Sequence, residues 1–286
     1  MNPTIFQGKV DIPDKGFTHG CKFHSDDVFS TAFLRMLKPD IQIIRGNEVP
    51  EDFDGIVYDI GMGKFDHHQL DKEYRENGCP YAAFGLLWRE FGAACVGEEE
   101  AAKFDAKFVQ PLDESDNTGC SNVLANIISE FNPGWDSDES FDDCFWKAEK
   151  FAEVILNNHF EAIAGIERGR ELVRADMERC DGEVLILSKF APWKGEVKGS
   201  GYQMVVYPSN RGGYSAQGVP DAESEEENTL VCEFPQEWRG KTAEELVEIT
   251  GLKTIRFCHP AGFLAAAEEQ EDAVAMARMA IEASKL

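Results

Sequence analysis

The sequence lacks closely spaced cysteines and long apolar runs. Its 286 residues include eight cysteines but no Cys-x-x-Cys pair, which argues against a structural zinc knot and against a disulfide framework. We therefore expect a reducing, cytoplasmic setting. No stretch approaches the roughly 20 apolar residues that cross a bilayer, and residues 1–6 do not combine a basic region with an apolar run. The sequence thus predicts neither a membrane protein nor a signal peptide.

Positive charge is also scarce. The chain has 28 Lys and Arg residues against 53 Asp and Glu residues, and its formal net charge is −25. Proteins bind long duplex DNA by replacing its counterions with Lys and Arg, and a surface this acidic opposes such binding at long range. Any nucleic-acid substrate is therefore expected to be short, single-stranded or held mainly by bound metal. The alternative is that the charge serves only solubility or a salty cytoplasm.

The first part of the chain alternates helix and strand patterns. Residues 26–37 and 80–91 carry apolar side chains at helical spacing, and residues 41–44 and 55–59 resemble short buried strands. Such alternation predicts a parallel sheet with covering helices. In this α/β architecture ligands bind beyond the carboxyl ends of the strands, where Asp59 is expected to lie.

The second part of the chain shows a long helical pattern followed by several strand patterns. A helical pattern runs from about residue 145 to residue 177, and strand patterns follow at residues 183–188, 202–207, 214–219, 229–234 and 254–258. We therefore predict two domains. Residues 1–180 would hold the parallel-sheet domain with a long linking helix, and residues 181–286 would form a smaller α+β domain.

Four of the six histidines gather in two clusters with aspartates. The first cluster contains His19 and His24, and Asp26 follows at the head of a helix, where it could also be only an N-cap. The second contains Asp66-His67-His68, which has little structural reason to exist. Imidazole and carboxylate without thiolate suit Mn, Zn or Fe better than Ca. The clusters therefore predict a metal site.

A further acidic pair extends this set. Asp113 and Asp116 lie three residues apart, on one helical face with Val109. A carboxylate pair that continues an apolar stripe needs a partner, which a metal ion can supply.

The order of these motifs resembles a known family. The pattern His-x4-His-x-Asp, then a strand with Asp-x-Gly, then Asp-His-His-Gln, then Asp-x-x-Asp-Asn is similar to the DHH phosphoesterase superfamily. Within it the match is closest to the Myg-type proteins, known as metal-dependent protein hydrolases or Myg exonucleases. The resemblance covers nearly the whole chain, since C-terminal signatures are present at residues 238–240, 245–246 and 257–263. One departure is the polar Glu114-Ser115 pair between Asp113 and Asp116.

The resemblance implies a two-metal phosphoesterase with a DHH-type N-terminal domain. One ion would be held by His19, His24 and Asp59. The other ion would be held by Asp26, Asp59, His67 and Asp116, so that Asp59 bridges the two. Manganese is the expected metal, with Mg²⁺, Zn²⁺ and Fe²⁺ as alternatives.

Other residues are assigned catalytic or binding roles by the same resemblance. His68 would face the substrate phosphate and Asp66 would orient the neighbouring ligands. A hydroxide shared by the two ions would attack phosphorus, which makes Asp59 catalytic as well. In the C-terminal domain His259, Gly262 and Arg211 are candidates for substrate binding. The alternative for Gly262 is that it only ends a strand and packs.

The expected activity is hydrolysis of phosphodiester bonds in short single-stranded RNA, DNA or nucleotide-like substrates, in the manner of an exonuclease. Alternatives are a phosphomonoesterase or pyrophosphatase, and a non-catalytic metal-binding regulatory protein, since one superfamily supports several reactions. The sequence leaves the oligomeric state open.

Overall fold

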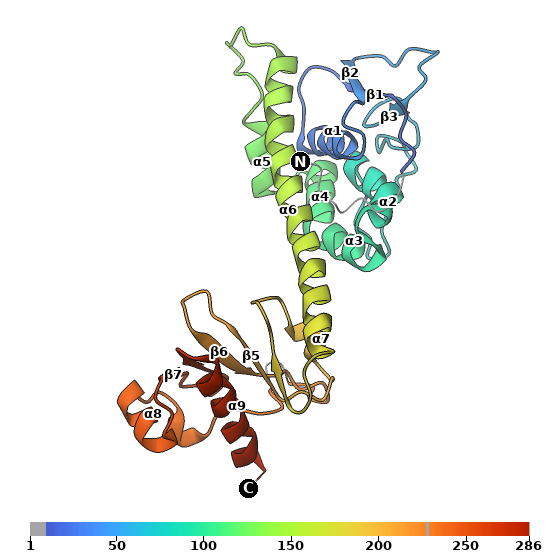
Figure 1. Ribbon diagram of the computed structural model, residues 1–286. Coiled ribbons are helices and arrows are strands. Elements are labelled where there is room, and N and C mark those ends of the chain that lie inside the picture. Colours follow the sequence, from blue (N-terminus) through green and yellow to red (C-terminus); the bar gives the residue numbers. More distant parts are fainter. Residues whose placement is uncertain (1–9, 227–228, 286) are drawn as a thin grey trace. The chain divides into compact units, whose positions relative to one another are not determined.

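The chain folds as two units. The computed structural model describes residues 10–226 and 229–285, so residues 1–6, which were examined for a signal peptide, lie outside the described part. One unit extends to Ala164 and the other begins at Gly165. This division falls inside α6 (Phe141–Met177), a single helix of 37 residues (Figure 1). The predicted domain boundary after residue 180 lies three residues beyond the end of α6 and stays a prediction.

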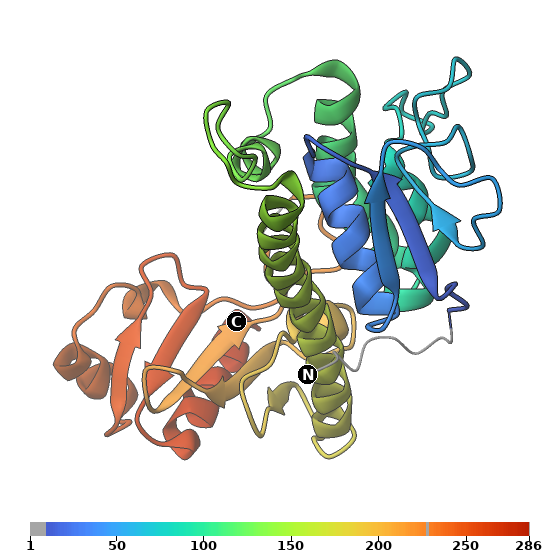
Figure 2. The same cartoon turned by 90° about the horizontal axis from the view of Figure 1, so that it is seen from above.

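The first unit contains a small parallel sheet. Its strands are β1 (Lys15–His19), β2 (Gln42–Gly46) and β3 (Ile56–Val57), in the order β2-β1-β3. Both neighbours of β1 pair with it in parallel, and Figure 2 shows α1 lying beside the strands. The parallel sheet with covering helices that the sequence predicts is therefore confirmed.

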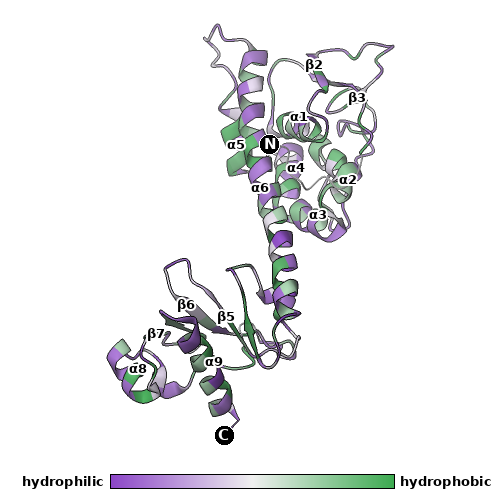
Figure 3. Ribbon diagram, viewed as in Figure 1, coloured by the Kyte–Doolittle hydropathy of each residue, from purple (hydrophilic) through white to green (hydrophobic). Residues whose placement is uncertain are grey.

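The helices of the first unit supply most of its core. They are α1 (Ser25–Leu37), α2 (Ala83–Val96), α3 (Glu98–Phe104), a π-helical turn (Asp105–Val109), α4 (Gln110–Thr118) and α5 (Val123–Ser129). Aromatic rings of α1 and α2 meet in this core, with Phe33 against both Phe84 and Trp88. Figure 3 shows how hydrophobic α2 is along its length.

Helix α2 extends past Gly92, where the sequence suggested an end. A Cβ at Gly92 would lie 2.6 Å from the Trp88 ring, so this glycine leaves room for packing. The helix ends at Gly97, whose φ of +82° favours glycine.

The second unit contains a mixed sheet of five strands. They are β4 (Val184–Ile186), β5 (Met204–Pro208), β6 (Tyr214–Gly218), β7 (Ile255–Cys258) and β8 (Leu264–Ala267), in the order β4-β5-β6-β8-β7. Only β4 and β5 pair in parallel. Helices α7 (Lys194–Val197), α8 (Ala243–Thr250) and α9 (Gln270–Ser284) and a 3-10 turn (Gln236–Trp238) complete the unit. This α+β arrangement confirms the predicted class.

One strand prediction in this unit is wrong, and one strand was not predicted. Residues 229–234 form no strand and contribute only an isolated bridge between Pro220 and Leu230. Strand β8 was not among the predicted strands, and its alanine-rich residues form a strand through pairing with β6 and β7.

All eight cysteines are free thiols. Across the described ranges no helix combines the length and hydropathy needed to span a membrane.

Candidate metal centre

Two site residues lie at the carboxyl ends of neighbouring parallel strands. His19 is the last residue of β1, and Asp59 follows β3 by two residues. The register pairs Phe17 with Val57, so both side chains emerge at the same edge of the sheet, and His19 Nε2 lies 3.1 Å from Asp59 Oδ2. Asp59 has a φ of +56°, a left-handed conformation that Asp adopts more readily than most residues. Its backbone N–H donates to the carbonyl of Phe65 at 3.0 Å, which fixes the turn.

Two more carboxylates come from the first turn of α1. Asp26 accepts hydrogen bonds from the backbone N–H groups of Ala83 and Phe84 at 2.9 and 2.7 Å. Asp26 therefore caps α2. The alternative that it caps its own helix, α1, is wrong. Asp27 is fully buried, accepts from the His24 backbone N–H at 2.8 Å and lies 3.3 Å from His19 Nε2.

The Asp-His-His motif closes the cluster from the other side. His67 Nε2 lies 3.1 Å from Asp116 Oδ2, and its Nδ1 faces Asp26 and Asp59 oxygens at 3.6 Å each. Asp66 is buried, accepts from the Met62 backbone N–H at 2.6 Å and lies 2.7 Å from His68 Nδ1. These contacts hold His68 and the turn, and the catalytic role of Asp66 stays a prediction.

The two carboxylates of α4 have different surroundings. Asp116 points to His67, whereas Asp113 is buried against Arg75 Nη2 at 2.8 Å and the backbone N–H of Gly85 at 3.1 Å. The prediction that a metal ion partners Asp113 is wrong, because Arg75 takes that place. The same guanidinium also binds Asp105 through two hydrogen bonds of 2.7 and 2.8 Å.

The ligand atoms converge in three groups within the described residues. In each group, one nitrogen or oxygen per side chain lies within 4.8 Å of the others, and the groups are His19, Asp27 and Asp59; Asp26, His67 and Asp116; and Asp59, Asp66, His67 and His68. The structure thus brings together most of the predicted ligands. It adds Asp27, which sequence reasoning left without a role. His24 lies at the rim, with its ring centroid 6.0 Å from that of His19, and its role as a ligand stays a prediction.

Buried polar atoms at the centre of these groups lack hydrogen-bond partners among the described residues. They are Asp27 Oδ2, Asp59 Oδ1 and His67 Nδ1. An unpaired buried polar atom costs about 1–3 kcal/mol. His19 Nε2 lies 3.3 Å from Asp27 Oδ2 and His67 Nδ1 lies 3.6 Å from Asp59 Oδ1, but neither pair forms a hydrogen bond, so a bound ion would stabilise these three orphans. Imidazole nitrogens and carboxylate oxygens form a donor set that suits divalent metal ions.

The cluster retains protons when it holds no metal. Burial, reinforced by the charges of Asp59 and Asp116, raises the pKa of Asp26 well above its ordinary value. Burial raises the pKa of Asp27 to about 7, although His19 opposes the shift. For His19 burial lowers the pKa, but the hydrogen bond with Asp59 and the charge of Asp27 outweigh it and raise the pKa to about 9. A metal ion would therefore displace protons from these groups.

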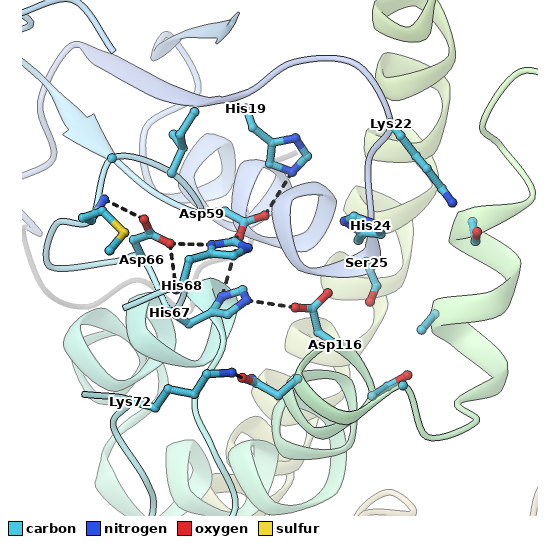
Figure 4. A pocket seen from close by; sticks show the side chains of 18 of the residues that line it. His19, Lys22, His24, Ser25, Asp59, Asp66, His67, His68, Lys72 and Asp116 are labelled. Carbon is cyan, nitrogen blue, oxygen red and sulfur yellow. Dashed lines mark hydrogen bonds and ion pairs between the residues drawn. The ribbon is translucent and has the colours of Figure 1, made fainter. Parts of the chain in front are cut away.

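A cavity of about 850 Å³ opens over the cluster (Figure 4). His19, His24, Asp59, His67 and Asp116 face it, and His68 exposes 57% of its side chain there. Its volume lies within the range of small-molecule sites, roughly 300–1,000 Å³. Substrate can thus approach the candidate ligands directly.

The predicted substrate-binding residues of the second unit do not form one site. His259 and Gly262 lie in the turn between β7 and β8, beside the end of β6 where Gln217 pairs with Leu264. Arg211 lies in the turn before β6, at the end where Tyr214 pairs with Ala267. Their roles in binding stay predictions.

Gly262 also has a packing reason to be glycine. Its φ is +75°, and a Cβ there would lie 2.4 Å from Arg239 Nε. That nitrogen donates to the carbonyl of Phe234 at 2.9 Å, so the turn and Arg239 fit together only without a side chain.

Comparison with known proteins identifies the family. A family model named MYG1 exonuclease, with the description uncharacterised protein family UPF0160, matches residues 16–281. The chain belongs to the MYG1 family. The Myg-type resemblance of its motifs is confirmed.

Relatives in the MYG1 family match along nearly their whole length. A MYG1 protein of Schizosaccharomyces pombe is 27% identical over 93% of this chain and 96% of its own. The MYG1 exonuclease of Homo sapiens is 25% identical over 96% of this chain and 88% of its own. A MYG1 protein of Chlamydia trachomatis is 26% identical over 92% of this chain and 94% of its own. No solved structure gives a significant match.

Proposed function

We propose that this MYG1-family chain is a two-metal phosphodiesterase that removes nucleotides from the ends of short single-stranded nucleic acids. Manganese is the ion we expect, because imidazole and carboxylate ligands suit it. The observation that carries the proposal is the set of orphaned atoms on Asp27, Asp59 and His67, which lie where the three ligand groups converge. The name exonuclease carried by the human and rat relatives supports the same reaction class.

The ligand sets would share Asp59. His19, Asp27 and Asp59 would hold one ion, with His24 at its open side, and Asp26, Asp59, His67 and Asp116 would hold the other. Two bound ions would activate water and stabilise negative charge on a phosphate. The side chains of this chain would hold the ions and orient the substrate.

His68 is the side chain best placed to touch the substrate. It is half exposed in the cavity, and its Nδ1 lies 2.7 Å from Asp66. A carboxylate partner at Nδ1 leaves Nε2 free to donate a hydrogen bond to a phosphate oxygen when the ring is protonated. The hydrogen bonds that Asp66 accepts from His68 and Met62 outweigh burial and keep its pKa low, so Asp66 remains an anion that holds the ring.

The acidity of the chain limits the substrate. With a net charge of −25, attraction of a long duplex is unfavourable, and short single strands are the substrates we expect. A cytoplasmic setting, which the free thiols support, is part of the same proposal.

A substrate panel tests the proposal. The purified chain would be incubated with pentanucleotides of RNA and DNA, a nucleoside monophosphate and pyrophosphate, with Mn²⁺ or with a chelator. We expect Mn²⁺-dependent release of mononucleotides from the pentanucleotides. Release of inorganic phosphate alone would instead identify a phosphomonoesterase or pyrophosphatase. Occupied metal sites without any turnover would identify a metal-binding protein that is not an enzyme.

A further inference from the structure

Two lysines line the cavity over the candidate metal centre. Lys22 lies in the loop between His19 and His24, and Lys72 follows His68 by four residues. Figure 4 shows Lys22 above and Lys72 below the His67–Asp116 pair. In a chain with 53 acidic residues against 28 Lys and Arg residues, cations at both sides of an acidic cluster call for an explanation.

Neither lysine is neutralised by a carboxylate. Over the described ranges Lys22 has no ion pair, although many other lysines do, such as Lys103 with Glu99 at 2.7 Å. Lys72 Nζ donates to Asn117 Oδ1 at 2.8 Å. Asn117 is itself anchored, since its amide donates to the carbonyls of Asp113 and Tyr81 at 3.0 and 3.1 Å. The fold therefore holds the Lys72 ammonium beside the metal-ligand helix with its positive charge unpaired.

The two lysines decide the sign of the loaded site. Asp26, Asp27, Asp59, Asp66 and Asp116 bring five negative charges when ionised, and two divalent ions return four positive charges. The metal-loaded centre is then −1, and Lys22 and Lys72 raise the cavity to +1. A positive net charge in the cavity favours a polyanion over a neutral ligand.

We propose that Lys22 and Lys72 bind backbone phosphates of an oligonucleotide on either side of the phosphate that is attacked. The inference rests on the proposed phosphodiesterase function and extends it, because it selects substrates with several phosphates over single phosphodiesters. Asn126 and Ser129 of α5 line the same cavity and add neutral hydrogen-bonding groups for the sugar–phosphate chain.

Paired substrates test the selectivity. Pentathymidylate carries several phosphates, whereas bis(p-nitrophenyl) phosphate carries one. For Lys22→Gln and Lys72→Gln, we expect the ratio of kcat/KM for pentathymidylate over that for bis(p-nitrophenyl) phosphate to fall about fivefold each at 0.1 M salt. The double variant should lose about 25-fold. These values follow from a single-strand salt slope of about 0.7 per phosphate contact.

A matched control removes the same charge elsewhere. Lys103→Gln in α3 abolishes a surface pair with Glu99 and Glu100 and should leave the ratio unchanged. Equal losses on both substrates, or equal effects of Lys103→Gln and the two cavity variants, would overturn the proposal.

Binding separates this inference from the proposed function. Fluorescence anisotropy with a labelled phosphorothioate pentathymidylate, in Mn²⁺ and at several salt concentrations, gives the slope of log K against log salt. Each cavity variant should reduce the slope by about 0.7. If the wild type hydrolyses neither substrate but the slopes change, only the phosphodiesterase proposal fails. If hydrolysis occurs and the slopes do not change, only the lysine assignment fails.

Discussion

The first unit contains two groups of buried carboxylates, which differ in whether a fixed cation lies beside them. Asp113 lies against Arg75, which also binds Asp105, so this group contains its own cation. Asp26, Asp27 and Asp59 are equally buried. Within the described residues, however, histidines are the basic side chains at ion-pair distance from them. The first group is complete as it stands, whereas the second is not.

This difference explains why one group is structural and the other a candidate site. Burying an unpaired carboxylate costs several kcal/mol, so a cluster that lacks a fixed cation must take up protons or a metal ion. The raised pKa values of Asp26 and Asp27 are the proton alternative. Burial raises the pKa of Asp113 as well, but there Arg75 opposes the rise. The orphaned atoms of Asp27, Asp59 and His67 mark where metal would replace those protons.

Asp59→Asn should have the largest effect on function. The amide keeps the shape but removes the charge of a residue that belongs to two of the three ligand groups. We expect Mn²⁺-dependent turnover to fall at least about a thousandfold, measured as kcat on pentathymidylate. The metal-free variant should remain folded, because the amide keeps the shape and Asp27 still lies 3.3 Å from His19 Nε2; urea denaturation checks this. Normal turnover would exclude Asp59 as the shared ligand.

Arg75→Met removes the cation from the complete group. We expect a loss of about 3–5 kcal/mol in the free energy of unfolding at pH 8, because Asp113 is left buried and unpaired. Burial already raises the pKa of Asp113 to about 7, and Arg75 opposes that rise. Since this folded pKa exceeds the ordinary value of 3.8, stability falls as pH rises from about 4 through 7, and it falls further without Arg75. The loss should therefore be smaller at pH 5.

Urea denaturation at both pH values measures this effect. Arg89→Met is the matched control, since Arg89 forms an exposed pair with Glu73 and should change stability by less than about 1 kcal/mol. Equal losses for Arg75→Met and Arg89→Met would show that the buried network contributes no more than a surface pair.

Gly85→Ala tests how closely the complete group is packed. An added Cβ would lie 1.8 Å from Asp113 Oδ2, so the carboxylate must move away from Arg75. We expect a loss of about 1–3 kcal/mol, measured by thermal unfolding. Gly165→Ala, in α6 where the nearest atom is 3.8 Å away, should instead stabilise the chain by about 0.5–1 kcal/mol. A neutral Gly85→Ala would show that the network can relax.

Proton release on metal binding is the mildest of these effects. At pH 7 the metal-free cluster carries protons, because the pKa of His19 is about 9 and that of Asp27 about 7. Ligands bind metal only when deprotonated, so affinity should increase as pH rises from 6 to 9, by about tenfold per pH unit for each proton released. Isothermal titration with Mn²⁺ in buffers of different ionisation enthalpy counts the protons. No release at pH 7 would mean that the ligands are already deprotonated.

The sequence was sufficient for the parts of the fold that carry strong periodic patterns. The apolar spacing of residues 26–37 predicts α1 almost to the residue. Strand β8 was missed because Leu264–Ala267 is rich in alanine, a helix former, and only pairing with β6 and β7 makes it a strand. Local preference cannot reveal such tertiary pairing.

The sequence also indicated most of the residues of the candidate metal centre, but not all of them. The resemblance to the Myg-type family implied Asp26, Asp59, His67 and Asp116 as ligands, and the structure brings these side chains together. Asp27 was missed because its burial is evident only in the structure, where residues 25–34 of α1 are all buried although half of them are polar.

The partner of Asp113 was out of reach for a different reason. Arg75 lies 38 residues away in sequence, in a segment without a helical or strand pattern. Only the three-dimensional structure shows that one carboxylate of the α4 pair has a protein cation and the other does not.

Metal content tests the central difference most directly. The metal-free chain would be equilibrated with Mn²⁺, freed of excess ion and analysed for bound metal per chain, beside Asp59→Asn. The account predicts two ions per wild-type chain and a clear loss in Asp59→Asn. A folded wild-type chain that retains no Mn²⁺, Zn²⁺ or Fe²⁺ would contradict it, because the buried carboxylates would then be satisfied by protons alone.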